Sequence, residues 1–278
     1  MASTFDARAY TTEAKQSWTS AAEGYDRMSA RLFEPMRRGF LSFLQLKHGQ
    51  LVLDVACGTG QLTKEAAAAI GPSGRVVGAD LSPGMLKIAM SRAVERNLEY
   101  REMDAQALDF PDDTFDVVVS HLGLMLFAEP ALALKEMGRV CKKGGVVAAL
   151  VQGDPNRMAY TSLILKTLFR LAPELKQEGA PGMYAFAPTG ALEQAMTQAG
   201  LSQPLSTRLS GTFRFASTDE YWQVFVEGSG RTAQLLRTLP QNLQDAVKRE
   251  ALDQASLYRM DGSLEIPFEV VMAKAVKR

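Results

Sequence analysis

Between Leu51 and Gln152, strand-like and helix-like patterns of hydrophobic residues alternate along the chain. This order predicts strands separated by helices. Short apolar runs rich in β-branched residues are typical of buried strands and occupy residues 51–56, 75–81, 115–122 and 146–152, and a further strand is predicted at 98–105. Segments rich in strong helix formers lie between the strands at residues 62–70, 82–97 and 129–143. The second of these predicted helices has Ser82 as its N-cap and Pro83 at its first position, and the third ends at Gly144. This order predicts an α/β fold with an open, parallel sheet covered on both faces.

The carboxyl-terminal half breaks this rhythm with longer insertions. The sequence predicts an apolar helix at residues 155–171, a loop at 172–190, a helix at 191–200, a strand near 205–215 and a last strand at 263–275. Before that last strand, one helix face carries Leu243, Val247, Ala251, Gln254 and Tyr258. Because the core resumes after each insertion, we expect a single domain over residues 1–278. Its predicted parts are a helical lid at 1–46, a central core at 47–152, and a C-terminal half at 153–278 with cap insertions at 153–190 and 216–260.

Composition narrows the classes of partner. Lysine plus arginine equals aspartate plus glutamate, at 31 each, so a polyanion such as nucleic acid is a disfavoured partner. The first residues lack a basic cluster followed by an apolar run, and no run of about 18 apolar residues occurs, so we expect neither a signal peptide nor a membrane span. The chain is therefore predicted to be cytoplasmic. Cys57 and Cys141 give neither a metal spacing nor a disulfide framework and are expected to be buried.

The stretch LVLDVACGTGQLT, residues 51–63, predicts a strand, a tight glycine turn and the start of a helix. Two glycines separated by one residue, Gly58 and Gly60, are a weak signal alone. A dinucleotide-binding fingerprint requires a third glycine where this chain has Thr63. Asp54, at the end of the strand, would also lie close to a pyrophosphate. The turn therefore favours a cationic or zwitterionic ligand over a diphosphate.

Acids follow two further strands at the same edge of the predicted sheet. Asp80 follows the second strand, where an acid accepts hydrogen bonds from a ribose diol, and Asp104 follows the third, where it can accept from an exocyclic amine. Together with Asp54, these acids outline a ligand that has a cationic amino-acid end, a sugar and a purine. S-adenosylmethionine has those parts.

Four blocks, taken in order, carry a resemblance to a known family: VLDVACGTG, VVGADLSPGML, MDAQALDFPDDTFDVVVS and LKEMGRVCKKGGVVA. They resemble the class I S-adenosylmethionine-dependent methyltransferases, in particular the branch of ubiquinone and menaquinone biosynthesis methyltransferases and their small-molecule relatives. The resemblance covers about residues 50 to 151. It implies a doubly wound, mostly parallel, Rossmann-like seven-stranded sheet with helical lid insertions, with S-adenosylmethionine as cofactor. One departure is Ala56, where many members carry glycine, which narrows the gap for the methionine end of the cofactor.

The resemblance also implies site residues. Gly58 and Gly60 would let the backbone approach the methionine portion, Asp80 would hold the ribose, and Asp104 with Ala105 would meet the adenine amine. The remaining implied cofactor contacts are Tyr25, Asp54, Ala56, Leu81, Met85 and Ser120. Each has a structural alternative: the glycines shape a turn, Asp80 caps the next helix, Asp104 is a solvated loop acid, and Tyr25 and Met85 belong to the core.

His121, at the tip of the fourth strand, is the candidate general base, since its ordinary pKa is about 6.5. Its alternative role is a hydrogen bond to backbone or cofactor, and His48 is expected at the surface. The following apolar segment SHLGLMLF and the insertion residues Met158, Met183, Tyr184, Phe186, Tyr221, Trp222 and Phe225 favour a small hydrophobic or aromatic acceptor. Nothing in the sequence indicates a metal site, and a homodimer is left open.

Three functions compete at this stage. The first is a small-molecule methyltransferase acting on carbon, oxygen or nitrogen. The second is an enzyme that binds the sulfonium but catalyses cyclisation or rearrangement. The third is a non-catalytic binding protein on the same fold, although nothing in the cofactor motifs of residues 50–151 is degraded.

Overall fold

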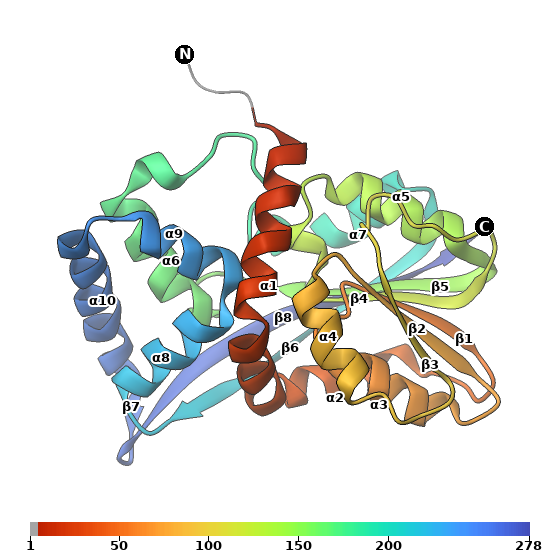
Figure 1. Ribbon diagram of the computed structural model, residues 1–278, viewed down its shortest axis with the longest axis horizontal. Helices are drawn as coiled ribbons and strands as arrows, with labels where there is room; N and C mark the ends of the chain where they lie inside the picture. Colours follow the sequence, from red (N-terminus) through yellow and green to blue (C-terminus); the bar gives the residue numbers. More distant parts are fainter. Residues whose placement is uncertain (1–4) are drawn as a thin grey trace.

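Seven strands form the main path of the central sheet in the computed structural model, which describes residues 5–278 (Figure 1). Their order is β3-β2-β1-β4-β5-β8-β6. The strands are β1 (Leu51–Val55), β2 (Arg75–Asp80), β3 (Leu98–Glu102), β4 (Phe115–His121), β5 (Cys141–Gln152), β6 (Leu201–Phe215) and β8 (Ser263–Lys277). Strands β1 to β5 pair in parallel, whereas β8 runs antiparallel to both β5 and β6. The predicted mostly parallel α/β sheet is confirmed; the short β7 (Arg259–Met260) adds an eighth strand against β8.

Helices cover both faces of this sheet, as the sequence predicted. In the view of Figure 1, α5 (Pro130–Val140) and α7 (Ala191–Gln198) lie above the sheet, and α2 (Glu34–Leu44) and α3 (Gln61–Ile70) lie below it. Helix α4 (Pro83–Ser91) packs against β2 and β3. The Ser82 hydroxyl accepts a hydrogen bond from the Met85 N–H at 3.2 Å, which confirms the predicted cap.

Two helices end earlier than predicted. Helix α4 ends at Ser91, and the next residue, Arg92, turns its guanidinium toward Asp26 on another helix, with two nitrogen–oxygen distances of 2.6 Å. Helix α5 ends at Val140, because Cys141 already pairs with Phe115 in the sheet. The irregular pairing at the start of β5 includes a residue with φ of 75°, which Gly144 adopts without steric cost.

The N-terminal segment forms two helices that are separated at Phe33. Helix α1 (Ala7–Leu32) begins directly after Asp6, whose carboxylate accepts from two backbone N–H groups of the first turn. Figure 1 shows α1 between the parallel part of the sheet and the helices of residues 159–171 and 218–255. Residues 1–4 of the predicted lid lie outside the described residues.

The two insertions gather into a cap on one side of the sheet (Figure 1). The cap consists of α6 (Ala159–Leu171), α8 (Thr218–Gly228), α9 (Gly230–Thr238) and α10 (Gln241–Ala255), with short 3₁₀ turns at Pro173–Leu175 and Ser256–Tyr258. Tyr258 therefore lies just after α10 and not on its predicted face. Helix α1 packs against α8 and α9, so the N-terminal segment and the cap form one layer. No helix in residues 5–278 combines the length and apolar sequence that crossing a bilayer requires.

An aromatic cluster fixes this cap to the extended part of β6. The Tyr160 ring of α6 lies 5.1 Å from Phe213, 6.1 Å from Phe215 and 5.6 Å from Phe225, measured between ring centroids. The Tyr221 hydroxyl donates to the Tyr160 carbonyl at 2.8 Å, so its polar atom is satisfied although its side chain is fully buried. Burial of such large rings stabilises the contact by about 1.5–3 kcal/mol each.

Glu269 on β8 is the polar anchor between cap and sheet. Its side chain is 1% exposed and contacts the guanidinium groups of Arg208 at 2.7 Å and Arg157 at 3.0 Å. It also accepts from the Asp154 N–H, where the chain leaves β5. Burial alone would raise the pKa of Glu269, but these hydrogen bonds outweigh it and lower the pKa.

Replacing Glu269 with glutamine should lower the free energy of unfolding by about 1.5–3 kcal/mol, because two cations lose a charged acceptor in a buried setting. Denaturant unfolding measures this change. The matched control is Glu265→Gln on the same strand, whose partner Arg214 is 75% exposed, and it should change stability by less than about 1 kcal/mol. Equal effects of the two substitutions would contradict the anchoring role of Glu269.

Candidate active site

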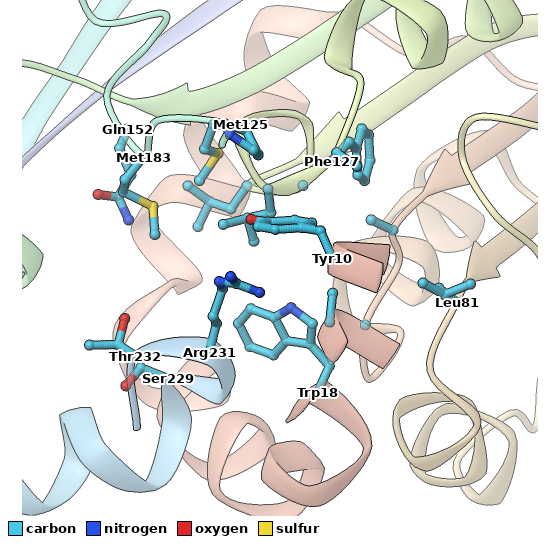
Figure 2. A pocket seen from close by; sticks show the side chains of 18 of the residues that line it. Tyr10, Trp18, Leu81, Met125, Phe127, Gln152, Met183, Ser229, Arg231 and Thr232 are labelled. Carbon is cyan, nitrogen blue, oxygen red and sulfur yellow. The ribbon is translucent and has the colours of Figure 1, made fainter. Parts of the chain in front are cut away.

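A cavity of about 330 Å³ lies where the carboxyl ends of β1 to β5 face α1 and the cap. One side of it is made by residues at the strand tips, among them Ala56, Gly58, Asp80, Leu81, Asp104, Ala105 and His121. The opposite side is made by α1 and by the cap helices (Figure 2). Ligands of open α/β sheets bind at this edge, so the predicted location of the site agrees with the cavity.

The glycine turn after β1 contains three left-handed residues. The φ angles are 58° for Ala56, 56° for Gly58 and 79° for Gly60. A Cβ atom on Gly58 would lie 3.2 Å from the Tyr25 ring, so glycine permits α1 to close onto the turn. Ala56 is tolerated because Gly123 faces it; a Cβ on Gly123 would come within 2.7 Å of the Ala56 Cβ.

Asp80 ties this turn to the next strand. One carboxylate oxygen accepts from the Gly58 N–H and the other from the Ser82 N–H, each at 2.8 Å. The cap of α4 is Ser82, so Asp80 supports the loop before that helix instead of capping it. Burial raises the pKa of Asp80, although these N–H groups act in the opposite direction. The acid also lines the cavity, where its remaining lone pairs can accept further hydrogen bonds.

Asp104 sits in a tight turn after β3. Its Oδ1 accepts from the Gln106 backbone N–H at 2.9 Å and from the Gln106 side-chain amide at 3.0 Å. Leu81, Met85 and Ala105 form an apolar wall of the cavity near it. Met85 and Ala105 are 2% and 8% exposed, so they serve the core and the cavity wall together.

Asp54 lines a second, much smaller polar cavity of about 10 Å³, which shares Tyr25, Ala56 and His121 with the large one. Its Oδ2 accepts a hydrogen bond from the Thr63 hydroxyl at 2.7 Å. Thr63, which stands where a dinucleotide-binding fingerprint has its third glycine, therefore holds the Asp54 carboxylate. Its Oδ1 is buried and has no partner among residues 5–278, and burial raises the pKa of Asp54 to about 7.

Arg37 brings a positive charge to this polar cavity. Its guanidinium donates to Glu65 at 2.7 Å and to the Ser29 carbonyl at 2.9 Å, and the residue is 5% exposed. The Thr59 hydroxyl, which also lines this cavity, is buried without a partner in the described part of the chain. An acid and a cation therefore line one polar space that is large enough for about one water molecule and adjoins the large cavity.

His121 lies between the two cavities and is 9% exposed. Burial, and next the positive charge of Arg37, lower the pKa of His121 to about 3. The imidazole is therefore neutral near pH 7, and its Nε2 has no partner within residues 5–278. A pKa this low removes most of the driving force for accepting a proton, which favours the hydrogen-bonding alternative for this residue.

Two of the predicted contacts do not line either cavity. Gly60 faces the Tyr100 ring, since a Cβ there would lie 2.3 Å from the Tyr100 hydroxyl oxygen. Ser120 is fully buried behind Gly123, and its hydroxyl oxygen would lie 2.7 Å from a Cβ at that glycine. Gly60 shapes the turn, and Ser120 supports the loop after β4. As expected, His48 is exposed and both cysteines are buried.

The part of the cavity farther from the acids is mainly apolar. The segment after β4 contributes Met125, Leu126 and Phe127, and the cap contributes Leu165, Phe169, Leu175, Met183, Phe225 and Leu235. Of the insertion residues that the sequence singled out, Met183 and Phe225 line this space, whereas Met158, Tyr184, Phe186, Tyr221 and Trp222 do not. Sequence reasoning missed the polar residues here, Gln152 and Arg231, and it also missed Arg37 of the small cavity.

Comparison with known proteins agrees with this geometry. A family profile described as "Methyltransferase domain" matches residues 53–149. The chain is 33% identical over 207 residues to the ubiquinone/menaquinone biosynthesis C-methyltransferase UbiE of Burkholderia cenocepacia, covering 69% of this chain and 85% of that protein. The chain belongs to the class I S-adenosylmethionine-dependent methyltransferases. A demethylmenaquinone methyltransferase of Anoxybacillus flavithermus is 35% identical over 149 residues, covering 51% of this chain and 63% of that protein.

A solved structure shows the same fold at low identity. Phosphoethanolamine N-methyltransferase 2 of Haemonchus contortus, in complex with S-adenosyl-L-methionine, aligns with a TM-score of 0.61 and 19% identity over 99% of this chain and 60% of that one. The predicted family, enzyme class and cofactor are thus confirmed, and methyl transfer is supported over the two alternatives. The cofactor of this methyltransferase is S-adenosylmethionine.

The residues of the site fit this cofactor. Its amino-acid end carries an ammonium and a carboxylate. Beside the large cavity, a water-sized polar space is lined by an acid oxygen of Asp54, the Thr59 hydroxyl and Arg37, and a water held there would link these groups to the ligand. A buried polar atom without a partner costs about 1–3 kcal/mol, which a polar ligand group would recover. The acids at the other strand tips and the apolar wall beside them suit a nucleoside.

The raised pKa of Asp54 predicts pH-dependent donor binding. A bound ammonium favours the ionised acid, so the pKa of Asp54 falls on binding and a proton is released. Affinity should therefore rise several-fold from pH 6 to about 7 and level off before the donor amine itself deprotonates near pH 8. Calorimetry at pH 6.5, in buffers of different ionisation enthalpy, counts the released proton. Asp54→Asn should abolish this release, and persistence of the release in that variant would assign it to another group.

Proposed function

We propose that this methyltransferase transfers the methyl group to a small acceptor with an apolar, aromatic body that binds beneath the cap. The observation that supports it most directly is the single cavity whose acidic strand-tip side continues into an apolar side built by the cap. The UbiE relatives are named for ubiquinone and menaquinone biosynthesis, so acceptors with a quinone-like ring are the first class to test.

The donor residues have separate roles in this proposal. Asp54, Thr59 and Arg37 would hold the amino-acid end, and Asp80 would accept from the ribose. Asp104 would accept from the adenine amine, with Leu81, Met85 and Ala105 against the purine. Tyr25 closes over Gly58, and Ala56 with Gly58 forms the floor of the turn.

The donor supplies an activated methyl group on its sulfonium, so the main task of this chain is to orient the acceptor and exclude water. Orientation of this kind accounts for about 7–11 kcal/mol of barrier reduction in well-aligned reactions. Helix α1 covers the cavity from one side through Tyr10 and Trp18, and the cap closes another side through Met183 and Phe225. No charged base is required of His121, which stays neutral and donates or accepts one hydrogen bond.

Gln152 is suited to orient a polar atom of the acceptor. The Thr161 hydroxyl donates to Gln152 Oε1 at 2.7 Å and lies 2.7 Å from the Tyr184 hydroxyl. The single hydroxyl proton of Thr161 is donated to Gln152, so the Tyr184 hydroxyl must donate to the Thr161 oxygen. The oxygen of the Gln152 amide is thereby occupied, which leaves its N–H donors for the cavity that this residue lines.

Other predictions from the sequence remain predictions. Cytoplasmic location and the lack of a nucleic-acid partner belong to this group, and a homodimer stays open. Independence from metal is a further prediction; in residues 5–278, no three His, Cys, Asp or Glu side chains come together as metal ligands would.

The central experiment uses the full-length protein with isotopically methyl-labelled donor and a panel of hydroquinone, phenol and arylamine acceptors. We expect label in a ring-containing acceptor, and product structure then identifies the acceptor atom. Asp80→Ala should weaken donor binding by about 1–3 kcal/mol and reduce labelling in proportion at low donor concentration. Conversion of an acceptor without incorporation of the labelled methyl group, or label found only in non-aromatic acceptors, would refute the proposed function.

Replacement of His121 by alanine separates its two roles. As a neutral hydrogen-bonding residue, it should affect donor affinity and turnover by similar factors, about 3- to 10-fold, and leave the pH profile between 6 and 8 unchanged. Donor titrations and initial rates across this pH range are the measurements. Loss of turnover alone, together with loss of an ionisation near pH 6.5, would instead identify a general base.

A further inference from the structure

Acidic and basic residues line different parts of the large cavity. The two acids, Asp80 and Asp104, come from the strand tips, and the two basic residues, Lys176 and Arg231, come from the cap. If the acids hold a cationic donor, as the proposed function requires, the acceptor side of the same cavity is basic. Complementarity then favours an acceptor that carries negative charge.

Arg231 is the basic residue best placed to contact a ligand. It is the second residue of α9, and its guanidinium carbon lies 4.0 Å from the centre of the Tyr10 ring (Figure 2). Its polar contacts are weak: Nη1 reaches Glu13 at 3.4 Å and Nη2 reaches Gln177 at 3.3 Å, both at the long end of the hydrogen-bond range. Since Glu13 is 50% exposed, water screens this ion pair. Most of the five N–H donors of Arg231 are therefore available to a ligand.

Two hydroxyl groups at the start of α9 have no hydrogen-bond partner in the described residues, and the Thr232 residue of the pair lines the cavity. Thr232 is 7% exposed and lines the cavity, yet its hydroxyl makes no hydrogen bond to any residue in 5–278. Ser229, the N-cap of α9, makes no side-chain cap, and its Oγ is buried and unsatisfied within the same residues. Trp18 packs against Gly230 at the first helical position. The positive end of the helix, Arg231 and the Thr232 hydroxyl thus converge at one place.

We propose that the acceptor carries a carboxylate, which binds to Arg231 and to the hydroxyl of Thr232 at the start of α9. The apolar walls from the cap then hold the ring, and the carboxylate fixes the orientation of the acceptor relative to the donor. This inference rests on the proposed function for its choice of ring, but the anion site is a separate claim.

A pair of matched probes tests the anion site: 1-hydroxy-2-naphthoate and its neutral amide, 1-hydroxy-2-naphthamide. Both are titrated into the full-length protein with S-adenosylhomocysteine present, by calorimetry and by quenching of tryptophan fluorescence, to which Trp18 beside the site contributes. We expect the carboxylate to bind at least about 10-fold more tightly than the amide. Arg231→Gln should reduce this preference to within about 2-fold.

Three further variants separate charge recognition from structural effects. Arg237→Gln removes an exposed arginine of the same helix and should keep the preference. Thr232→Val keeps the side-chain shape and should weaken the carboxylate about 3- to 10-fold but leave the amide unchanged. Glu13→Gln removes the competing acid and should strengthen carboxylate binding about 2-fold or more.

The outcomes distinguish this inference from the proposed function. Equal affinity for the two probes, no binding of either probe, or a preference that survives Arg231→Gln would overturn the anion site, whatever the labelled-donor assay shows. Binding of S-adenosylhomocysteine is read in the same titrations, so a defect in the donor site would be seen separately.

Discussion

The carboxylate of Asp80 is the contact on which the site depends. It accepts from the Gly58 N–H and the Ser82 N–H, and so joins the turn after β1 to the loop before α4. A turn with left-handed residues has backbone N–H groups that point away from regular ladders, and an acid at the neighbouring strand tip satisfies one of them. The floor of the cavity is thereby held by hydrogen bonds within the chain itself.

The walls opposite this floor come from distant parts of the chain. Helix α1 lies between the sheet and the cap, and Tyr25 closes onto the glycine turn while Tyr10 supports Arg231. The cap is attached to the sheet at a few strong points, among them the aromatic cluster around Tyr160 and the ionic anchor at Glu269. In the proposed function the strand tips, together with Tyr25 and Arg37, would bind the donor and the cap would bind the acceptor, so the two recognition surfaces come from different parts of the chain.

Unsatisfied polar atoms concentrate at the small cavity around Asp54, Thr59 and His121. Burial raises the pKa of Asp54 to about 7 and lowers that of His121 to about 3, so both groups are held closer to their neutral forms. The two shifts affect stability in opposite directions. The lowered pKa of His121 stabilises the folded state above pH 6.5, and this contribution is lost as the pH falls toward 3. The raised pKa of Asp54 stabilises the folded state at low pH, and that contribution is lost as the pH rises through 7. Perturbed pKa values of this kind cluster at the functional sites of proteins.

The sequence by itself determined the strands, the glycine turn and the acids at the strand tips, because these follow from local periodicity and from the order of elements. It also identified the apolar segment after β4 and, through four ordered blocks, the family. Tertiary structure alone placed Arg37, Gln152 and Arg231, since each reaches its cavity through contacts that no local pattern records; Arg231 meets Tyr10 across more than two hundred residues. Structure also decided that His121 is neutral and that Ser120 lies behind the loop, because pKa and side-chain direction depend on burial and neighbours, which only the folded chain provides.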